Sequence, residues 1–473
     1  MKYLKKIQNH SQNNPNRVAI SLNSKISYSS FWQLAINLAF FLKKKKINRI
    51  CILQSDNDDF ISYIAIVASL ISGKTYIPLN KNTPLNRLKL IIKSSKSNIL
   101  ISQKKIKEKV NCKLFFHNDI LKLKKIRNFK IINSSKDAYI IYTSGSTGEP
   151  KGVRISRKSL DHYIFWISKS FFKDNDIRCS QHPGIGFDLS VADIFGTLCN
   201  GGTLFPIQNN YDQLFLSKFI KKNNLTHWVS VPSAVDLICN KNFSYKKDLS
   251  SLKKMLFCGE VLKKIHLQKI FSLNKNINVI NTYGPTEATV SCTSISLNYK
   301  NYKSFCKPSA SFGKPIIDMK IGFLGGTKKQ GEIFISGPQL SKGYIDNKIL
   351  NKKKFIKIKN KQSFVTGDMC KFINGNYYFL NRVDRQVKIL GFRIELDEID
   401  SLIGNLTKNT SHSIIYKNKI FTFFNGKLNE NYLNIKLKKY LPKYMLPYEI
   451  IRVKKFPKNL NFKIDENKLI KLI

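Results

Sequence analysis

The chain has 473 residues, of which 42% are hydrophobic, so it is long enough for more than one domain and too apolar for a disordered chain. Its formal net charge of +51 comes mostly from lysine, which is spread along the whole sequence beside abundant asparagine and isoleucine. These three residues have A+T-rich codons, so a compositional bias explains the charge, and no nucleic-acid-binding motif accompanies it. We therefore expect no nucleic-acid partner.

Other global features favour a cytoplasmic protein. No apolar run approaches the roughly 18 residues that a membrane-spanning helix needs. Residues 1–15 lack the apolar segment of a secretory signal. The nine cysteines are scattered without a C-x-x-C pair, which argues against structural zinc and against a disulfide framework. We expect a monomer without a membrane span.

The first half of the chain alternates strand-like and helix-like segments. Residues 50–53 read as a buried strand, 60–71 as a helix and 76–79 as a second strand, which is typical of parallel α/β architecture. Beyond about residue 300 the segments become short and β-rich, as at 331–335 and 376–380. We therefore expect an α/β fold with a small β-rich subdomain.

A further change in pattern follows Asp384. A basic strand (386–389), an acidic helix start (395–399) and a mixed tail come after it. We predict a large N-terminal domain of β-sheets flanked by helices (1–383) and a small, mobile α+β C-terminal domain (384–473).

The most specific string is YIIYTSGSTGEPKG at 139–152, in which a buried strand leads into a loop closed by Lys151. Glycines let backbone N–H groups approach an anion, hydroxyls add donors and the lysine adds a charge. The spacing of a P-loop is not met, and Pro150 precedes the lysine. An ordinary turn is the alternative for such a composition, but this string predicts a phosphate-binding loop. Its predicted ligands are Thr143, Ser144, Gly145, Ser146, Thr147, Gly148 and Lys151.

This string resembles the signature loop of the acyl-adenylate-forming ligases, which include acyl-CoA synthetases, luciferases and amino-acid adenylation domains. The resemblance continues in order over nearly the whole chain and implies ATP-dependent, AMP-forming chemistry at a site between two domains. The other segments that resemble family motifs are 26–28 with 35–42, 73–79 with 84–88, 187–195, 281–287, 366–368, 382–395 and 461–465.

The resemblance implies roles for several nucleotide-binding residues. Tyr283 would stack on adenine and Asn281 would bind the purine edge. Glu287 would bind Mg²⁺, which prefers carboxylate and phosphate oxygens. Asp368 would accept hydrogen bonds from the ribose hydroxyls, and Arg382 would add a ribose contact. Their neighbours in the same predicted site are Thr282, Gly284, Pro285 and Thr286.

Lys463 is the implied catalytic residue. Attack of a carboxylate on the α-phosphorus brings two anions together, and a lysine that contacts both would stabilise the transition state. Asp384 would be the hinge of the C-terminal domain. Two positions depart from the family pattern, which has glycine where this chain has Asn381 and Phe462. Asparagine tolerates left-handed geometry, whereas Phe462 leaves an inactive relative as an alternative.

The substrate residues separate the branches of the family. In amino-acid-activating members an aspartate at the position of Asp188 pairs with the α-ammonium group; a helix cap is the structural alternative. An acyl-CoA synthetase, the less favoured reading, would need no charge there. Leu189, Cys258 and Val290 would line the pocket, which is mostly apolar and suits a small neutral amino acid. Other transferred lining positions are Ala192, Val229, Leu256, Thr282 and Ser291.

Two segments, 256–262 and 281–290, resemble the D-alanine–carrier protein ligases of teichoic acid modification. There, a cysteine at the position of Cys258 crowds one face of the α-carbon. Segment 384–389 is more similar to peptide-synthetase adenylation domains, so a freestanding enzyme for another small amino acid is the alternative. The sequence contains no G-x-[DH]-S-L site. We therefore expect transfer to the phosphopantetheine thiol of an acyl or peptidyl carrier protein in trans.

Overall fold

The fold was described from a computed structural model of the chain. The structure describes all residues except 56–58, 104, 105, 107, 135, 146, 147, 241, 308, 328 and 460–463.

Two compact units make up the chain. One change from the first unit to the second falls between Val383 and Asp384. The second unit also takes in two short segments from the first half of the sequence. The first unit consists of Met1–Lys81, Ser95–Ile141 and Gly152–Val383, and the second of Asn82–Ser94, Tyr142–Lys151 and Asp384–Ile473.

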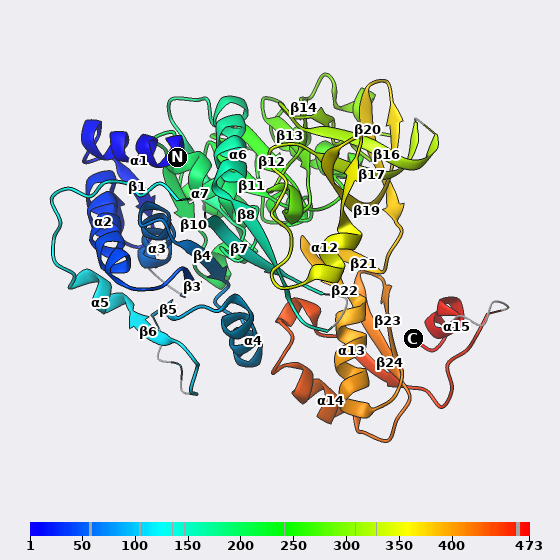
Figure 1. The fold of residues 1–473 in the computed structure, drawn as a ribbon. Coiled ribbons are helices and arrows are strands. Elements are labelled where there is room, and N and C mark those ends of the chain that lie inside the picture. Colours follow the sequence, from blue (N-terminus) through cyan, green and yellow to red (C-terminus); the bar gives the residue numbers. More distant parts are fainter. Residues whose placement is uncertain are drawn as a thin grey trace. The chain divides into compact units, whose positions relative to one another are not determined.

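A six-stranded sheet, in the order β6-β5-β3-β4-β7-β8, contains the strands expected in the first half of the chain. β3 pairs in parallel with β4 and β5. In the sequence, α3 (Phe60–Ile71) connects β3 to β4. This helix is buried along nearly its whole length and packs beside α2 (Tyr28–Lys44) (Figure 1). Asp59 starts α3, because its carboxylate accepts from the Ser62 N–H at 2.9 Å. The strands are β3 (Arg49–Leu53), β4 (Thr75–Leu79), β5 (Ile99–Ser102), β6 (Lys113–Phe116), β7 (Asp137–Thr143) and β8 (Lys151–Ser156).

A second sheet of nine strands has the order β15-β14-β13-β12-β11-β9-β10-β1-β2. Its central strands are parallel, and antiparallel strands stand at both ends. The strands are β1 (Val18–Ser21), β2 (Lys25–Ser27), β9 (Arg178–Gln181), β10 (Thr203–Pro206), β11 (His227–Ser230), β12 (Lys254–Phe257), β13 (Asn278–Tyr283), β14 (Thr293–Leu297) and β15 (Lys314–Pro315).

Helices of the first unit pack on these sheets; α7, for example, contacts β9 and β10. They are α1 (Lys2–Asn13), α2, α3, α5 (His117–Leu121), α6 (Arg157–Ser170), α7 (Ser190–Leu198), α8 (Asn210–Leu214), α9 (Leu216–Lys222), α10 (Ala234–Ile238), α11 (Lys264–Leu273) and α12 (Lys348–Lys354). Short 3₁₀ turns are η1 (Lys246–Asp248), η2 (Thr286–Ala288) and η3 (Tyr302–Phe305).

The β-rich subdomain is a five-stranded antiparallel sheet in which β16-β17-β19-β18 follow one another and β20 pairs with β19. It confirms the change of pattern expected beyond residue 300. The strands are β16 (Lys320–Thr327), β17 (Gln330–Ser336), β18 (Phe355–Ile358), β19 (Lys361–Ile373) and β20 (Asn376–Arg382).

The second unit has its own apolar core, in which α13 (Leu396–Thr407) packs beside β23 and α14 (Figure 1). Ile399 and Ile403 on α13 and Phe424 on β24 are fully buried there. This α+β composition agrees with the expectation for the C-terminal part of the chain. Its further elements are α4 (Leu85–Ser95), β21 (Gln386–Ile389), β22 (Phe392–Glu395), β23 (Ser411–Tyr416), β24 (Lys419–Phe424), α14 (Glu430–Leu437), η4 (Lys443–Met445), β25 (Glu449–Arg452) and α15 (Glu466–Ile470).

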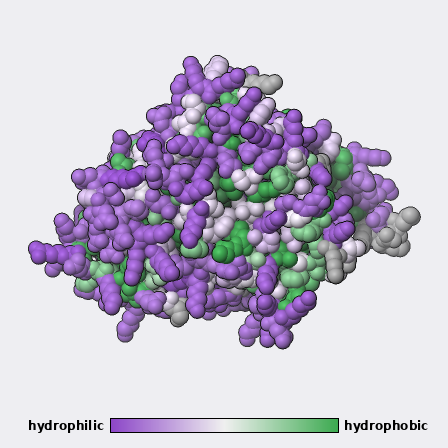
Figure 2. Space-filling model, turned by 90° about the horizontal axis from the view of Figure 1, so that it is seen from above, coloured by the Kyte–Doolittle hydropathy of each residue, from purple (hydrophilic) through white to green (hydrophobic). Residues whose placement is uncertain are grey.

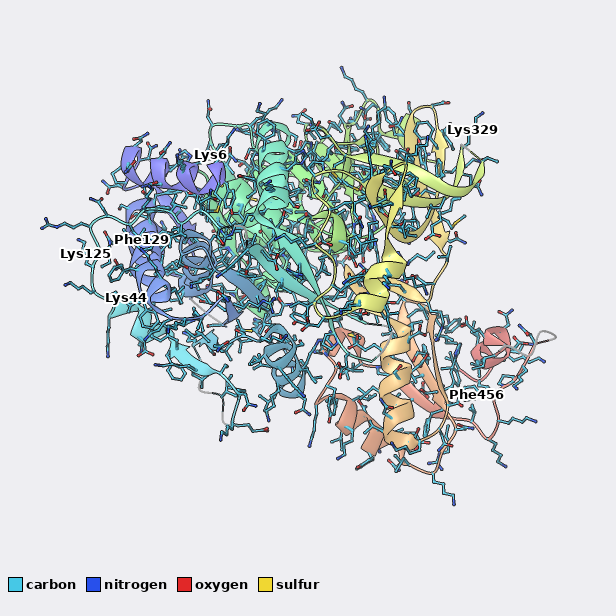
Figure 3. The ribbon with its side chains drawn as sticks, in the orientation of Figure 1. Lys6, Lys44, Lys125, Phe129, Lys329 and Phe456 are labelled. Atoms are coloured by element: carbon cyan, nitrogen blue, oxygen red, sulfur yellow. The ribbon has the colours of Figure 1, made fainter. Side chains whose placement is uncertain are left out.

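The basic residues do not gather at one place. Lys6 lies on α1, Lys44 on α2, and Lys125 and Lys329 in connecting segments of the first unit; all four are exposed (Figure 3). In the view of Figure 2, hydrophilic residues cover most of the visible surface, with small hydrophobic areas between them. None of the described helices combines the length and apolar character needed to cross a membrane.

Candidate functional site

The predicted phosphate loop joins β7 to β8 and belongs to the second unit. Gly145 donates its N–H to Glu398 Oε2 at 2.9 Å, and the Lys151 ammonium contacts Glu395 Oε1 at 3.0 Å. The Ser144 hydroxyl donates to the Arg393 carbonyl at 2.9 Å. Backbone, hydroxyl and ammonium donors of the loop thus bind acceptors from the start of α13 and the strand before it. Ser146 and Thr147 lie outside the described residues.

Carboxylates therefore stand where the sequence predicts phosphate. Glu398 also accepts from Arg87 Nη1 at 2.6 Å, and both side chains are nearly fully buried. Lys151 and Glu395 are about nine-tenths buried. Two buried carboxylates held by a lysine, an arginine and a backbone amide show that the chemistry of this loop suits oxyanions.

The predicted ribose residues form one buried group in the first unit. Asp368 on β19 and Arg382 on β20 are directly opposite in the register, and their side chains pair at 2.5 Å. Tyr283, at the end of β13, donates its hydroxyl to Asp368 Oδ2 at 2.5 Å. Burial, followed by the charge of Asp368, raises the pKa of Tyr283 well above its ordinary value. Strands from two different sheets thus bring three residues together that are up to 99 positions apart, from Tyr283 to Arg382.

Asn281 lies on the same strand as Tyr283. Its amide nitrogen donates to the Ser311 carbonyl at 2.8 Å, and its buried carbonyl oxygen has no hydrogen-bond partner among the described residues. The Tyr283 ring packs against Phe312, with 4.6 Å between centroids. One acceptor beside this aromatic pair is therefore available to a donor such as an exocyclic amine.

The loop after β13 is closely packed. Thr282 donates its hydroxyl to the Phe257 carbonyl at 3.0 Å. A Cβ added at Gly284 would stand 2.6 Å from the Val290 carbonyl oxygen, so only glycine fits there. Pro285 caps the 3₁₀ turn η2, which contains Thr286 and Glu287.

Glu287, the predicted metal ligand, is fully buried. Its Oε1 accepts from the Tyr344 hydroxyl at 2.6 Å, and its backbone carbonyl accepts from Ser341 N–H at 2.8 Å. In the part of the chain that the structure describes, no cluster of three or more His, Cys, Asp or Glu side chains could hold a metal ion. A single carboxylate is the pattern for Mg²⁺ that takes its other ligands from phosphate and water.

The predicted substrate residues come from three neighbouring places. Asp188 is half-buried just before α7, whose N-cap residue Leu189 makes no side-chain cap. Cys258 follows β12 and donates its thiol to the Val290 carbonyl, with 3.6 Å between sulfur and oxygen. Leu189, Cys258 and Val290 are all buried in the extended apolar core of the first unit. Three further predicted lining residues, Ala192, Val229 and Leu256, lie in the same core.

The sequence analysis did not single out three buried residues of the first unit that bear on this region: Tyr163, Gln339 and Tyr344. Tyr163 on α6 is fully buried, and its hydroxyl has no hydrogen bond of ordinary geometry among the described residues. Burial, followed by the neighbouring Cys258, raises its pKa, while the hydroxyl of Ser291 lowers it. Gln339 and Tyr344 hold the loop that contains Glu287 and Val290. In the sequence, Tyr163 has the spacing of an ordinary core residue on a helix. Gln339 stands between a proline and a leucine, and no motif there indicates a functional role.

The remaining predicted residues lie at the C-terminal part. Lys463, the implied catalytic cation, and Phe462 fall outside the described residues. Asp384 opens the third segment of the second unit, where its carboxylate accepts from Gln386 N–H at 3.4 Å.

Comparison with known proteins identifies the family. A profile described as AMP-binding enzyme matches residues 7–345. The chain belongs to the AMP-binding enzyme family. The predicted resemblance to adenylate-forming ligases is thereby confirmed, and this AMP-binding enzyme has curated relatives that are ligases.

Two relatives of this AMP-binding enzyme carry the name D-alanine–D-alanyl carrier protein ligase. The protein of Listeria monocytogenes serotype 4a (strain HCC23) is 31% identical and covers 86% of each chain. That of Bacillus licheniformis is 30% identical and covers 99% of each chain. A solved structure of the Vibrio cholerae adenylation domain AlmE in complex with glycyl-adenosine-5'-phosphate is 24% identical, with a TM-score of 0.83 over 99% of this chain and 96% of that one. The last comparison confirms the fold.

Proposed function

We propose that this AMP-binding enzyme activates a small neutral amino acid with ATP and transfers it to the phosphopantetheine thiol of a separate carrier protein. D-alanine is the favoured substrate. The observation that carries the proposal is the buried group of Tyr283, Asp368 and Arg382, which assembles an aromatic ring, a carboxylate and a guanidinium from separate strands. These are the groups that an adenosine requires for stacking and for its two ribose hydroxyls.

The proposal assigns each part of ATP to groups of matching chemistry. The orphaned carbonyl oxygen of Asn281 can accept from the adenine amine beside Tyr283. The donors of Gly145 and Lys151, which bind carboxylate oxygens in the second unit, would suit the phosphates. Glu287 would supply one carboxylate ligand to Mg²⁺, which would neutralise phosphate charge during attack.

Lys463 is the proposed catalytic residue, because a cation that contacts both the substrate carboxylate and the α-phosphate offsets their repulsion in the transition state. We propose 1–383 and 384–473 as the two domains and Asp384 as the hinge that lets one site serve two half-reactions. Adenylation needs Lys463 at the phosphorus. Transfer needs room for the thiol, and Gly391 at the β21–β22 turn has no side chain to obstruct it.

The substrate proposal rests on Asp188 and Cys258. A half-buried carboxylate before α7 can pair with an α-ammonium group, and a fatty acid has no such group. The Cys258 thiol and the Val290 backbone are neighbours, with 3.6 Å between sulfur and carbonyl oxygen, and the proposal takes them as the apolar side of a pocket for a small side chain. The names of the relatives support D-alanine, at about 30% identity.

The proposed carrier partner follows from the same relatives, whose name includes a carrier protein. An exposed, basic surface would favour an acidic carrier in diffusional encounter. A cytoplasmic location is part of the proposal, because ATP, the amino acid and the carrier protein would all be soluble. A monomeric state is also proposed.

ATP–pyrophosphate exchange tests the substrate. The enzyme would be offered D-alanine, L-alanine, glycine, D-serine, L-serine and a short fatty acid. D-alanine should support the fastest exchange. Asp188→Asn, which keeps the shape and loses the charge, should lower exchange by about 10- to 100-fold, as expected when a hydrogen bond to a charged group becomes a neutral one. Exchange that depends on the fatty acid and not on any amino acid would instead establish an acyl-CoA synthetase.

Transfer needs its own measurement. The aminoacyl mass increment should appear on a carrier that bears phosphopantetheine and not on the same carrier without it. Exchange without loading of any carrier would retain the adenylation step and reject the carrier-loading step.

A further inference from the structure

Two consecutive residues beside Cys258 have an unusual backbone. Thr289 has a φ of 55° and Val290 a φ of 71°. Both are β-branched, and the left-handed region is strongly disfavoured for such side chains. Ser291 N–H donates to the Thr289 carbonyl at 2.9 Å, which closes a three-residue γ-turn around Val290. With a positive φ at its centre, this is the rare and strained form of that turn.

Strain of this kind persists only where the surroundings impose it. The γ-turn is fully buried, and Gln339 contacts it on both sides. The Thr289 hydroxyl donates to the Gln339 backbone carbonyl at 2.6 Å. The Gln339 side-chain amide donates to the Ser291 carbonyl at 2.8 Å. One residue therefore fixes the residue before Val290 and the residue after it.

The rest of the segment strengthens this contact. Ser341 N–H donates to the Glu287 carbonyl at 2.8 Å, and the Ser159 hydroxyl donates to the Leu340 carbonyl at 3.1 Å. The backbone around Gln339 is thus held from α6 as well as from the loop itself. Gln339 is fully buried, and its side-chain oxygen has no partner among the described residues. The hydrogen bond of the Gln339 side chain is therefore the one that its amide donates to the Ser291 carbonyl.

The γ-turn has a direct effect on the proposed substrate pocket. The carbonyl that accepts the Cys258 thiol belongs to Val290, the central residue of the turn. The Val290 side chain lies in the same apolar core as Cys258. A change in the turn would therefore move the thiol's acceptor and the isopropyl group at once.

We propose that Gln339 is a positioning residue for amino-acid selectivity: it holds the Thr289–Val290 γ-turn in its strained form and so places Val290 and the Cys258 thiol against the substrate's α-carbon. This rests on the proposed function only in taking Cys258 and Val290 as substrate neighbours. Among the residues that the structure describes, Gln339 forms hydrogen bonds with Thr289 and Ser291 and none with Cys258 or the predicted nucleotide residues. Its effect should therefore fall on the amino acid and not on ATP.

The test is Gln339→Met, which keeps the length of the side chain and removes the amide, so that the hydrogen bond to the Ser291 carbonyl is lost together with an oxygen that has no partner among the described residues. We expect the KM for the preferred amino acid to rise and the preference for it over its mirror image to fall, each by about tenfold, which corresponds to one buried hydrogen bond. The KM for ATP should not change. Gln339→Leu, which also lacks a side-chain donor, should show the same split and serves if the methionine variant fails to fold.

Ser159→Ala is the matched control, because it removes a hydrogen bond to Leu340 in the same segment without touching the γ-turn. It should lower the unfolding temperature by a similar amount and leave the preference between enantiomers unchanged. If Gln339→Met and Ser159→Ala both leave that preference unchanged, Gln339 is only structural and the inference is wrong.

The wild-type enzyme separates this failure from failure of the proposed substrate. If it prefers an amino acid other than D-alanine, the D-alanine assignment falls, and the Gln339 comparison is made on the amino acid it does prefer. If it activates no amino acid, both proposals are overturned.

Discussion

Tyr283 and Asp368 are joined by a hydrogen bond of 2.5 Å between the phenol oxygen and Oδ2, while the other carboxylate oxygen of Asp368 pairs with Arg382 at the same distance. Both oxygens of the proposed ribose ligand are thus oriented by protein groups from different strands. A carboxylate oxygen can accept more than one hydrogen bond, so this arrangement fixes Asp368 without using up its capacity.

Asp368→Asn should therefore raise the KM for ATP by about 10- to 100-fold, because hydrogen bonds to the charged carboxylate become hydrogen bonds to a neutral amide. The amino-acid KM should change little. Initial-rate kinetics with each substrate varied in turn measures this. An equal increase in both KM values would show a general distortion of the enzyme and would contradict the ribose role.

The hydroxyl of Tyr163 offers a stability test. Tyr163→Phe removes a buried hydroxyl that has no well-formed hydrogen bond in the described structure, so the free energy of unfolding should stay within about 0.5 kcal/mol or rise. Tyr63→Phe is the matched control, since the buried Tyr63 hydroxyl donates to Gln181 Oε1 at 2.7 Å. It should cost about 1–2 kcal/mol. Urea unfolding of both variants gives the comparison, and equal losses would mean that Tyr163 has a partner after all.

The two half-reactions should respond to different variants. Lys463→Ala should abolish adenylate formation and spare transfer from a supplied aminoacyl-adenylate, because its charge is needed only at the phosphorus. Gly391→Trp should do the reverse and block carrier loading while pyrophosphate exchange persists. Exchange and single-turnover loading, each measured on both variants, test this.

Gly391 has a φ of 81°, so any larger residue also strains the β21–β22 turn. Gly391→Asn controls for this strain, because asparagine tolerates positive φ and is far smaller than tryptophan. It should retain most of the loading activity. If Lys463→Ala and Gly391→Trp impair both half-reactions equally, the C-terminal part does not alternate between two roles.

The buried His227 predicts a loss of stability in mild acid. Burial lowers its pKa from 6.5 to about 4, although Asp174, at 2.9 Å, acts in the opposite direction. Between these two values the unfolded chain binds a proton that the folded chain does not. The contribution of His227 to the free energy of unfolding is therefore fully present above pH 6.5. It falls as the pH decreases toward 4, by up to about 1.4 kcal/mol per pH unit. Urea unfolding of the wild type and of His227→Gln from pH 7 to 4.5 should show a shallower slope for the variant; parallel slopes would contradict the assignment.

Much of the fold could be predicted because its patterns are local. The strand at Arg49–Leu53, the buried helix Phe60–Ile71 and the strand at Thr75–Leu79 are each within a residue of the predicted bounds, since apolar runs of these lengths have few alternatives. The change to short antiparallel strands beyond residue 300 followed from turn residues between β-rich segments. The second unit was not predictable in full. Its segments Asn82–Ser94 and Tyr142–Lys151 join it through contacts such as that of Arg87 with Glu398, which depend on pairing across 311 positions.

The candidate site shows the same division. Tyr283, Asp368 and Arg382 could be named because each lies in a string with a strong family resemblance, and the structure brings them together. Gln339 and Tyr163 could not, because their importance comes from what they touch. Gln339 acts through two hydrogen bonds to a strained turn, and nothing in the composition around Val290 predicts a positive φ.

The carboxylates on the phosphate loop have a consequence for competition among small anions. Glu395 binds the Lys151 ammonium and Glu398 binds the Gly145 N–H, so an incoming anion must displace two carboxylates. Because both carboxylates belong to the protein chain, they lose no translational freedom when they bind again. A free monovalent or divalent anion that makes the same contacts has no compensating interactions elsewhere. Under the proposed function, a nucleotide would have adenine and ribose contacts in addition to those of its phosphates. The proposed function therefore predicts that inorganic phosphate alone binds this loop weakly, whereas a ligand that binds through more than its phosphates can displace the two carboxylates.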